Sequence, residues 1–330
     1  MPSIAIIGAG LSGLTLAHQL SDVAEVRLFE KSWRAGGRLA TREHPDMSFD
    51  HGAQFFTIRS DRFRSFVQPL IDSGCLQRWD AHFVEYQGAQ VMHQHQWNAE
   101  FPHYVAVPGM NHLAAELAKG LNITSQCHIS ALTRVDDAWV LHDSNHQSYA
   151  GFDWVLVCLP AQQSAALLPR HFSHYSAVSN IEMLGCYALM LGFDAPVPLP
   201  FEAALVREAD ISWMSVNNSK PGRPERFTLL VQATNQWASQ HMDWPDDDVM
   251  SHMLAEIERV TGQAVSHAAH QQLHRWRYAN ICKQSQANVY LDQQLQLAAC
   301  GDWCHHGRVE AAFDSADRLA SALRGCVSGR

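Results

Sequence analysis

A glycine-rich turn between two apolar segments near the start of the chain constrains the fold more than any other feature. Ile4–Ile7 is a short apolar run typical of a strand buried on both faces, and Gly8–Gly13 follows it directly as G-x-G-x-x-G. The next run, Val26–Phe29, predicts a second strand that ends at Glu30. Between them, apolar residues recur at helical spacing: Leu11, Leu14, Ala17 and Leu20. This order predicts a βαβ unit that binds a dinucleotide.

Each position of the turn has a physical task in that interpretation. Gly8 permits the tight turn, Gly10 lets the backbone approach a pyrophosphate, and Gly13 lets helix and strand pack closely. The helix then begins at Leu11 and Ser12, where free N–H groups and the helix dipole favour an anion. A dinucleotide pyrophosphate is therefore expected at the start of this helix.

Two features after the second strand complete the predicted nucleotide site. Glu30, followed by Lys31, stands where a carboxylate accepts hydrogen bonds from a ribose diol. Gly36 and Gly37 then allow the backbone to pass close to a phosphate, and Arg38 can donate charge-assisted hydrogen bonds to it. Arg42 can do the same.

The pattern of strands and helices in the rest of the chain indicates two domains. Residues 123–159 are strand-rich, residues 110–119 form a helix, and residues 295–300 form a strand followed by a terminal helix. Residues 181–193 and 226–233 predict longer strands, and a helix begins after Pro245. We therefore expect a nucleotide domain built from both ends of the chain, with a second domain inserted.

Composition and charge exclude several classes of protein. Lys and Arg number 24 against 33 Asp and Glu, so the net charge of −9 argues against nucleic-acid binding. No run of about 18 apolar residues predicts a membrane span. The eight cysteines are scattered and form no C-x-x-C pair, so we expect a reduced, cytoplasmic compartment. The histidine pairs at 93/95 and 305/306 lack the other ligands of a metal site, so no metal is expected.

Several longer segments narrow the family. They are Asp50–Thr57 (DHGAQFFT), Pro108–Met110 (PGM), His274–Ala279 (HRWRYA) and Gly301–Glu310 (GDWCHHGRVE). Together with the glycine turn, Glu30 and Gly36-Gly37-Arg38, they resemble the renalase-like family, with its bacterial relatives, within the FAD-dependent amine oxidase superfamily. The resemblance runs almost end to end.

The resemblance implies an α/β (α+β) fold: a discontinuous Rossmann-like FAD-binding domain with an inserted mixed-sheet substrate domain. It places the FAD-binding domain at residues 1–57, 106–160 and 290–330, and the substrate domain at 58–105 and 161–289. FAD is expected to be bound without a covalent link.

The resemblance also assigns roles toward FAD. Glu30 would hold the adenosine ribose, Arg38 would lie by the pyrophosphate, and Asp302 would hydrogen-bond the ribityl chain or a phosphate. The helix beginning near Arg308 would point its positive end at the flavin pyrimidine edge. The other residues expected to contact FAD are Gly8, Gly10, Leu11, Ser12, Gly13, Lys31, Gly37, Gly52, Ala53, Gln54, Phe55, Gly301, Val309 and Glu310.

The implied reaction is oxidation of dihydronicotinamide isomers, the 2- or 6-dihydro forms of NAD(P). Hydride passes to the flavin and then electrons pass to dioxygen, which gives hydrogen peroxide. Trp276, Gln232 and Phe55 are the expected substrate-side residues, with Trp276 as an aromatic wall and Gln232 as a hydrogen-bonding group.

The sequence departs from the family pattern at four positions. Gln232 stands where histidine is common, and Phe55 stands where tyrosine is common. Ala311 and Ala316 replace two glycines of the terminal segment. Gln232 keeps hydrogen-bonding capacity but cannot titrate, so substrate choice or rate can differ.

Two alternatives remain. An FAD-dependent amine oxidase or desaturase of another small substrate would carry a lysine beside the flavin, on a strand matched to residues 181–193, and that segment has none. A non-catalytic FAD-binding protein would hold a flavin that neither a dihydronicotinamide nor an amine bleaches.

Overall fold

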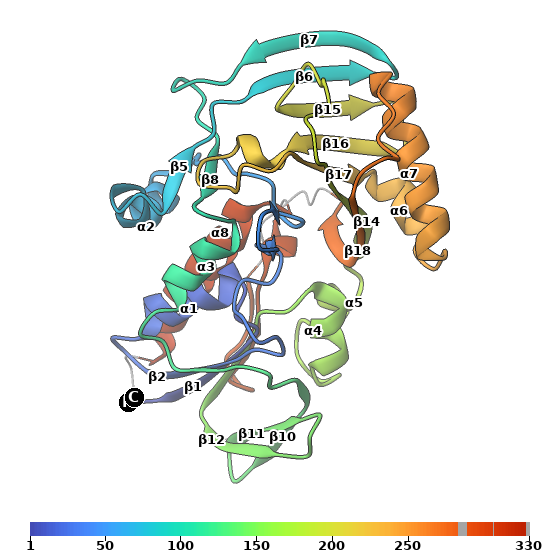
Figure 1. The fold of residues 1–330 in the computed structure, drawn as a ribbon. Helices are drawn as coiled ribbons and strands as arrows, with labels where there is room; N and C mark the ends of the chain where they lie inside the picture. The colour runs from blue at the N-terminus through green and yellow to red at the C-terminus, as the bar shows by residue number, and fades with distance from the viewer. Residues whose placement is uncertain (283–288, 306, 328–330) are drawn as a thin grey trace. The chain divides into compact units, whose positions relative to one another are not determined.

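The structure is a computed structural model that describes residues 1–282, 289–305 and 307–327. The chain forms two compact units, coloured by residue number in Figure 1. Unit 1 comprises Met1–Arg38, Ala114–Met183 and Ile281–Arg330, and unit 2 comprises Leu39–Leu113 and Leu184–Asn280. Each unit is thus assembled from separate stretches of the chain.

Unit 1 is built on a six-stranded sheet in the order β19-β20-β13-β1-β2-β9. Strand β1 lies parallel to both β13 and β2, and β20 continues the parallel set. The strands are β1 (Ser3–Ile7), β2 (Glu25–Phe29), β9 (Ile123–Thr124), β13 (Trp154–Val157), β19 (Tyr290–Asp292) and β20 (Leu297–Ala299). This sheet confirms the Rossmann-like expectation.

Helices and a small antiparallel sheet complete unit 1. Helix α1 (Leu11–Leu20) packs along α8 (Val309–Val327), so the first and last helices of the chain lie side by side (Figure 1). The three-stranded sheet consists of β10 (Ile129–Val135), β11 (Ala138–Asp143) and β12 (Ser148–Phe152). The remaining helical segments are α4 (Ala161–Leu167), α5 (Tyr175–Ser179), η2 (Asp302–Cys304) and most of α3 (Asn111–Ala118).

Unit 2 is built on a seven-stranded mixed sheet in the order β18-β14-β17-β16-β15-β6-β7. Strand β15 pairs with β6 in parallel, while β14, β17 and β16 form antiparallel pairs. The strands are β6 (His82–Gln87), β7 (Gln90–Gln96), β14 (Met183–Gly192), β15 (Ala203–Arg207), β16 (Ile211–Val216), β17 (Thr228–Ala233) and β18 (His270–Ile281). Short elements accompany it: β3 (Arg42–Glu43), β4 (Ser48–Phe49), α2 (Asp61–Asp72), β5 (Leu76–Arg78), β8 (Tyr104–Ala106), η1 (Asn217–Ser219) and α6 (Asn235–Gln240).

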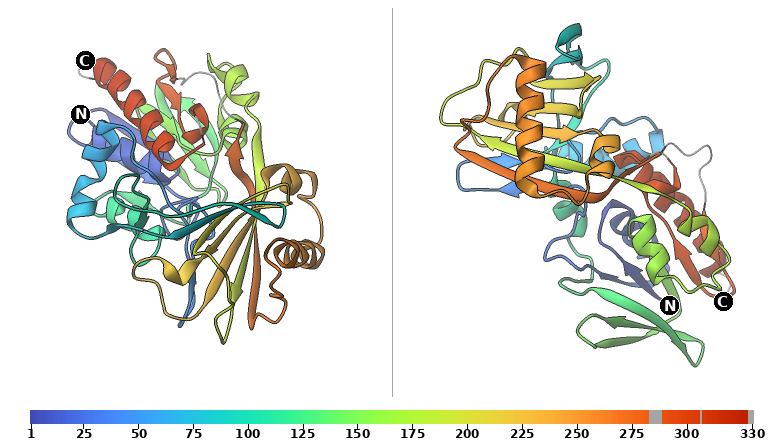
Figure 2. Two further views of the ribbon diagram at one scale, coloured as in Figure 1. Left: turned by 90° about the horizontal axis from the view of Figure 1, so that it is seen from above. Right: turned by 90° about the vertical axis from the view of Figure 1, so that its right-hand side faces the viewer.

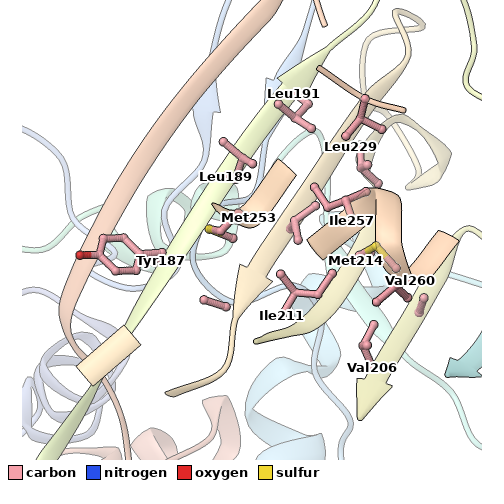
Figure 3. Packing of buried hydrophobic residues seen from close by; sticks show 14 of the residues in the cluster. Tyr187, Leu189, Leu191, Val206, Ile211, Met214, Leu229, Met253, Ile257 and Val260 are labelled. Carbon is pink, nitrogen blue, oxygen red and sulfur yellow. The ribbon is translucent and has the colours of Figure 1, made fainter. Parts of the chain in front are cut away.

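Different residues pack against the two faces of this sheet. Helix α7 (Asp246–Thr261) lies along one face (Figure 2), where Val249, Met253 and Ile257 pack against alternate residues of β14 and β17 (Figure 3). Residues in between, such as Ala188 and Met190, point to the opposite face and pack with Phe49 and Met47. That second face carries the candidate substrate-side residues.

The compact units depart from the expected domain boundaries. The sequence assigns residues 39–57 and 106–113 to the FAD-binding domain, whereas their contacts place them in unit 2. The reason is packing: Phe49 of β4 belongs to the core of the unit 2 sheet, and β8 pairs with β5. Residues 161–183, together with 281, 282 and 289, are expected in the substrate domain but belong to unit 1. The functional division into an FAD-binding and a substrate domain stays a prediction.

None of the helices in the described part of the chain combines the length and apolar character needed to cross a membrane.

Candidate active site

The glycine turn of unit 1 has the geometry that its motif predicts. Gly8 has a φ of +101°, and a Cβ there would lie 2.7 Å from the carbonyl oxygen of Cys158. A Cβ on Gly13 would lie 2.0 Å from the carbonyl oxygen of Gly8, so helix α1 could not approach β1 with any larger residue. A Cβ on Gly10 would meet no heavy atom within 4 Å, which leaves the backbone open to a ligand.

Glu30 is buried at the end of β2, and its carboxylate accepts hydrogen bonds from two backbone N–H groups. Ala9 N donates to it at 2.9 Å and Ser32 N at 2.8 Å. The loop that follows folds back over the turn, because Gly36 N donates to the Ala9 carbonyl at 2.8 Å. Glu30 therefore fixes the turn and holds its remaining acceptor sites in a set position.

Arg38 and Asp302 come together in unit 1 although they lie far apart in sequence. Arg38 Nη1 donates to Asp302 Oδ2 at 2.9 Å, and Nη2 donates to Oδ1 at 2.5 Å. The side chains are 30% and 7% exposed, so the bidentate pair is largely shielded. The ion pair fixes two side chains that the sequence assigned to FAD.

Two helix N-termini meet at the same end of unit 1. Ser12 Oγ at the start of α1 donates to the Ala312 carbonyl in the first turn of α8, at 2.8 Å. Val309 and Glu310 begin α8, while Arg308 and Lys31 are exposed. The N-terminus of α1, beside the open backbone of the glycine turn, fits a pyrophosphate.

Cys304, two residues after Asp302, is not a reactive thiol. Cys304 is 2% exposed, and burial raises its pKa well above the usual range. A protonated, buried thiol is a poor nucleophile, which supports a flavin held without a covalent bond.

In unit 2, the segment expected beside the isoalloxazine ring begins at a buried carboxylate. Asp50 accepts hydrogen bonds from Thr41 Oγ1 at 2.7 Å, Met110 N at 2.9 Å, Lys220 Nζ at 3.1 Å and Arg223 Nη2 at 2.6 Å. Burial opposes ionisation, but the two cations hold the pKa of Asp50 well below its usual range. The charged cluster anchors the start of the segment.

Lys220 connects this cluster to Gln54, four residues further along the segment. Its Nζ also donates to Asn217 Oδ1 at 3.0 Å and to Gln54 Oε1 at 3.3 Å. Burial lowers the pKa of Lys220 to about 8, with Asp50 opposing the shift and Arg223 adding to it. Gln54 is held again by Ser215 Oγ, which donates to its Oε1 at 2.8 Å.

The sheet also binds the backbone carbonyls of this segment. Trp276 Nε1 donates to the His51 carbonyl at 2.8 Å, and Gln232 Nε2 donates to the Gly52 carbonyl at 3.0 Å. Gln54 Nε2 donates to the same Gly52 carbonyl at 3.2 Å. The structure therefore brings together Trp276, Gln232, Gly52 and Gln54, four residues that the sequence assigned to the site.

Two imidazoles surround Trp276. The His51 ring stacks on the indole, with centroids 5.5 Å apart and an interplanar angle of 19°. His274 meets the indole edge-on at 4.3 Å and His51 at 4.7 Å. Burial lowers the pKa of both histidines to about 4, so both rings are neutral at pH 7.

Phe55 lies in an aromatic cluster of unit 2. Its ring is 5.3 Å from Trp213, the cross-strand partner of Gln232. Its other ring neighbours, at 5.0 to 6.4 Å, are Trp79, Trp97 and His103. Among the described residues, the ring contacts of Phe55 do not include Trp276.

Sequence reasoning missed the polar residues beneath the segment. Asn217, Lys220 and Arg223 lie in a polar run between the predicted strands at residues 181–193 and 226–233, yet Asn217 and Lys220 are at most 2% exposed. The signal available was Asp50 itself, a carboxylate that directly follows Phe49 at the start of the DHGAQFFT segment. Ala311 and Ala316 are buried in α8, where their methyl groups take part in packing.

Comparisons with known proteins agree with this geometry. Residues 6–70 match the family model described as an NAD(P)-binding Rossmann-like domain, and residues 65–324 match the model described as flavin containing amine oxidoreductase. Renalase from Mus musculus is 21% identical over 360 aligned positions, which cover 98% of this chain and 99% of the mouse protein.

Further relatives match a smaller part of the chain or have a lower sequence identity. Tryptophan 2-monooxygenase from Agrobacterium tumefaciens (strain Ach5) is 35% identical over 104 residues, 28% of this chain and 13% of that protein. The solved structure of wild-type putrescine oxidase bound to putrescine has a TM-score of 0.70 at 10% identity and covers 98% of this chain and 99% of that chain, which shows a shared fold. Since the amine-oxidoreductase match spans most of its length, this chain belongs to the flavin containing amine oxidoreductase family and is an FAD-dependent oxidoreductase.

Proposed function

We propose that this protein is a renalase-like oxidase that oxidises 2- or 6-dihydro isomers of NAD(P), with dioxygen as the electron acceptor. Bound FAD would supply the hydride acceptor and pass the electrons to dioxygen, which gives hydrogen peroxide. The observation that carries the proposal is the fixed, neutral aromatic surface around Trp276.

Trp276 is held as a rigid wall. Its indole N–H is committed to the His51 carbonyl, and one face of the ring is covered by the His51 imidazole. The side chain is only partly buried. A flat dihydropyridine could stack on the remaining surface at a set angle, and hydride transfer depends on that alignment.

Gln232 offers a hydrogen-bond acceptor of fixed orientation. A carbonyl oxygen accepts only, so the bond to Gly52 must come from the Gln232 amide nitrogen and turns Oε1 away from it. Within the described residues no protein donor reaches this Oε1. It can accept a hydrogen bond from the N–H₂ of a nicotinamide carboxamide.

The chemistry requires no general base in the protein. A dihydropyridine is already electron-rich and loses hydride directly, so the chain needs only to bind, orient and exclude alternatives. His51 and His274 have pKa values of about 4 and are weak bases at pH 7. Their neutrality suits an uncharged ring better than it suits an ammonium group.

An amine oxidase is the second candidate, supported by the family itself and by the fold shared with putrescine oxidase. Strand β14, matched to the strand that carries the flavin-side lysine of classical amine oxidases, contains no lysine. The buried lysine of unit 2, Lys220, is committed to Asp50, Gln54 and Asn217. This pattern favours the first proposal.

We assign the adenosine and diphosphate part of FAD to unit 1. Glu30 would accept the ribose diol, the N-terminus of α1 would receive the pyrophosphate, and the N-terminus of α8 would point at the flavin pyrimidine edge. Arg38 and Asp302 would act as one oriented pair, and Gly52 to Phe55 of unit 2 would face the ring system. The eight free cysteines fit a reducing, cytoplasmic compartment, which we include in the proposal.

Anaerobic mixing of the holoprotein with 2-, 4- and 6-dihydronicotinamides and with simple amines tests the function. We expect the 2- or 6-dihydro isomers to bleach the flavin absorbance rapidly and the amines to leave it unchanged. Bleaching by amines alone would replace the proposal with the amine oxidase. A flavin that no compound reduces would indicate a non-catalytic FAD-binding protein.

A further inference from the structure

We propose that His274 is a second substrate-binding side chain, which donates a hydrogen bond to the carboxamide oxygen of a dihydronicotinamide stacked on Trp276. This inference rests on the proposed function and names the group that recognises the substrate carboxamide together with Gln232.

The first support is the face of the sheet on which His274 lies. Leu273 packs into the core under α7, and Arg275 lies over the Tyr187 ring of that same core at 5.3 Å. Because strand residues alternate between faces, His274 and Trp276 share the opposite face. Trp276 packs there against the cluster that contains Ala188.

The second support is the register of His274 relative to the residues on the neighbouring strands. Strand β18 lies next to β14 in the sheet. The side chain of His270 lies beside Gly192, and the carbonyl of Trp276 lies beside Gly185. His274, between these two positions, is therefore at the same level as Ala188 on β14. Ala188 pairs in turn with Gln232 on β17. His274 and Gln232 therefore stand on one row, two strand spacings or about 10 Å apart, with only a methyl side chain between them.

The third support is what the imidazole does in the protein. His274 makes ring contacts with Trp276 and His51, but among residues 1–282, 289–305 and 307–327 no group hydrogen-bonds its nitrogens. The side chain is partly exposed, and neither nitrogen is sealed from solvent. A polar group in this state is available to a ligand.

The charge state of His274 suits an uncharged partner. Burial, with a smaller contribution from Arg42, lowers its pKa to about 4. The neighbouring His51 is neutral for the same main reason. A neutral imidazole always carries one N–H donor, so at pH 7 the ring can donate to a carbonyl oxygen without bringing a charge.

The two ends of the row match the two ends of a primary carboxamide. Gln232 presents an acceptor for the N–H₂ group, and His274 presents a donor for the C=O group. A simple amine is protonated at pH 7, so it offers donors alone and leaves the His274 N–H without a partner, which disfavours it. The row therefore accounts for selection of a nicotinamide over an alkylamine.

The test compares His274→Phe with His274→Gln, which retains an N–H donor. His270→Phe is the matched control, since His270 lies on the same face of β18 and packs on Phe49. Calorimetric titration of each holoprotein with NAD⁺, which bears the same carboxamide, measures binding without turnover. Anaerobic stopped-flow traces with the reactive dihydro isomer and with its 3-acetylpyridine analogue, which keeps the carbonyl and lacks the N–H₂, give the kinetic counterpart.

We expect His274→Phe to weaken NAD⁺ and both dihydro substrates about tenfold, the effect of one lost hydrogen bond of ~1.4 kcal/mol. His274→Gln should restore most of the affinity, and His270→Phe should bind like the wild type. Unchanged affinity in His274→Phe overturns the inference. Equal losses in the Phe and Gln variants, together with lower melting temperatures, assign His274 to packing instead. If the wild-type flavin is reduced by no dihydronicotinamide, the proposed function itself fails, whatever the variants do.

Discussion

Glu30 tests the nucleotide site at the scale of one residue. Its buried carboxylate accepts two backbone N–H groups and would also accept the ribose diol. Charged hydrogen bonds contribute ~1.5–3 kcal/mol. A change of ~1.4 kcal/mol in binding free energy is a tenfold change in the dissociation constant. Glu30→Ala should therefore raise the FAD dissociation constant about ten- to a hundredfold, measured by quenching of flavin fluorescence. Glu25→Ala, an exposed change on the same strand, is the control. Unaltered FAD affinity in Glu30→Ala would place the ribose elsewhere.

Trp276 tests the substrate wall. Trp276→Ala should slow anaerobic flavin reduction at saturating substrate while FAD stays bound, because stacking distance and alignment are lost. Trp276→Phe keeps an aromatic face but loses the N–H donated to His51, so an intermediate rate is expected. Stopped-flow traces and thermal melts on the same preparations are compared. Truncation of a core tryptophan costs ~3–5 kcal/mol, so early melting with a wild-type reduction rate would make Trp276 a packing residue.

At the scale of an element, Asp50, Lys220 and Arg223 connect the loop after β16 to the segment that we propose faces the flavin. Asp50→Asn leaves two buried cations without a counter-charge, which should cost ~3–5 kcal/mol. Lys220→Met leaves one neutral pair, Asp50 with Arg223, so its effect on the free energy of unfolding should be smaller. Denaturant titrations of both variants measure the order. A reversed order would show that Lys220, and not Asp50, holds the cluster together.

The same cluster predicts a pH dependence. The pKa of Lys220 is lowered to about 8 from an ordinary value of 10.5. Between these values the unfolded chain binds more protons than the folded one, so this lysine makes stability rise as pH increases from about 8 to 10.5. Lys220→Met should remove that contribution, seen as a smaller slope in the unfolding free energy across this range. An identical slope in wild type and variant would contradict the lowered pKa.

At the scale of the whole molecule, the protein is expected to hold FAD without a covalent bond. The purified protein should be yellow, and acid precipitation should release intact FAD into the supernatant. A ligand that binds only the folded state stabilises it by about 2.7 kcal/mol at a hundred times its dissociation constant. Added FAD should therefore raise the melting temperature of the apoprotein. Colour retained in the precipitate would show a covalent flavin.

The Rossmann-like part of the fold could be predicted from local sequence patterns. Strand, glycine turn, helix and acid fall within residues 3–30, and the contact of Glu30 with Ala9 spans only 21 positions. Short-range geometry of this kind leaves a readable pattern, because each residue type is required by its immediate neighbours. The later family segments pointed to Trp276 and Gln232 without showing what they bind.

The arrangement of the proposed substrate-side residues depends on contacts between distant parts of the chain. Trp276 meets His51 across 225 positions, and Lys220 meets Asp50 across 170. A polar run such as residues 217–223 has the composition of a surface loop, and only packing over a charged partner makes its burial favourable. The boundaries of the compact units differ from the expected domain boundaries for a similar reason. Strand β4 is too short to predict from the sequence, and its place is set by the core in which Phe49 packs. Long-range burial and charge pairing depend on which segments meet, and that information is not local in the chain.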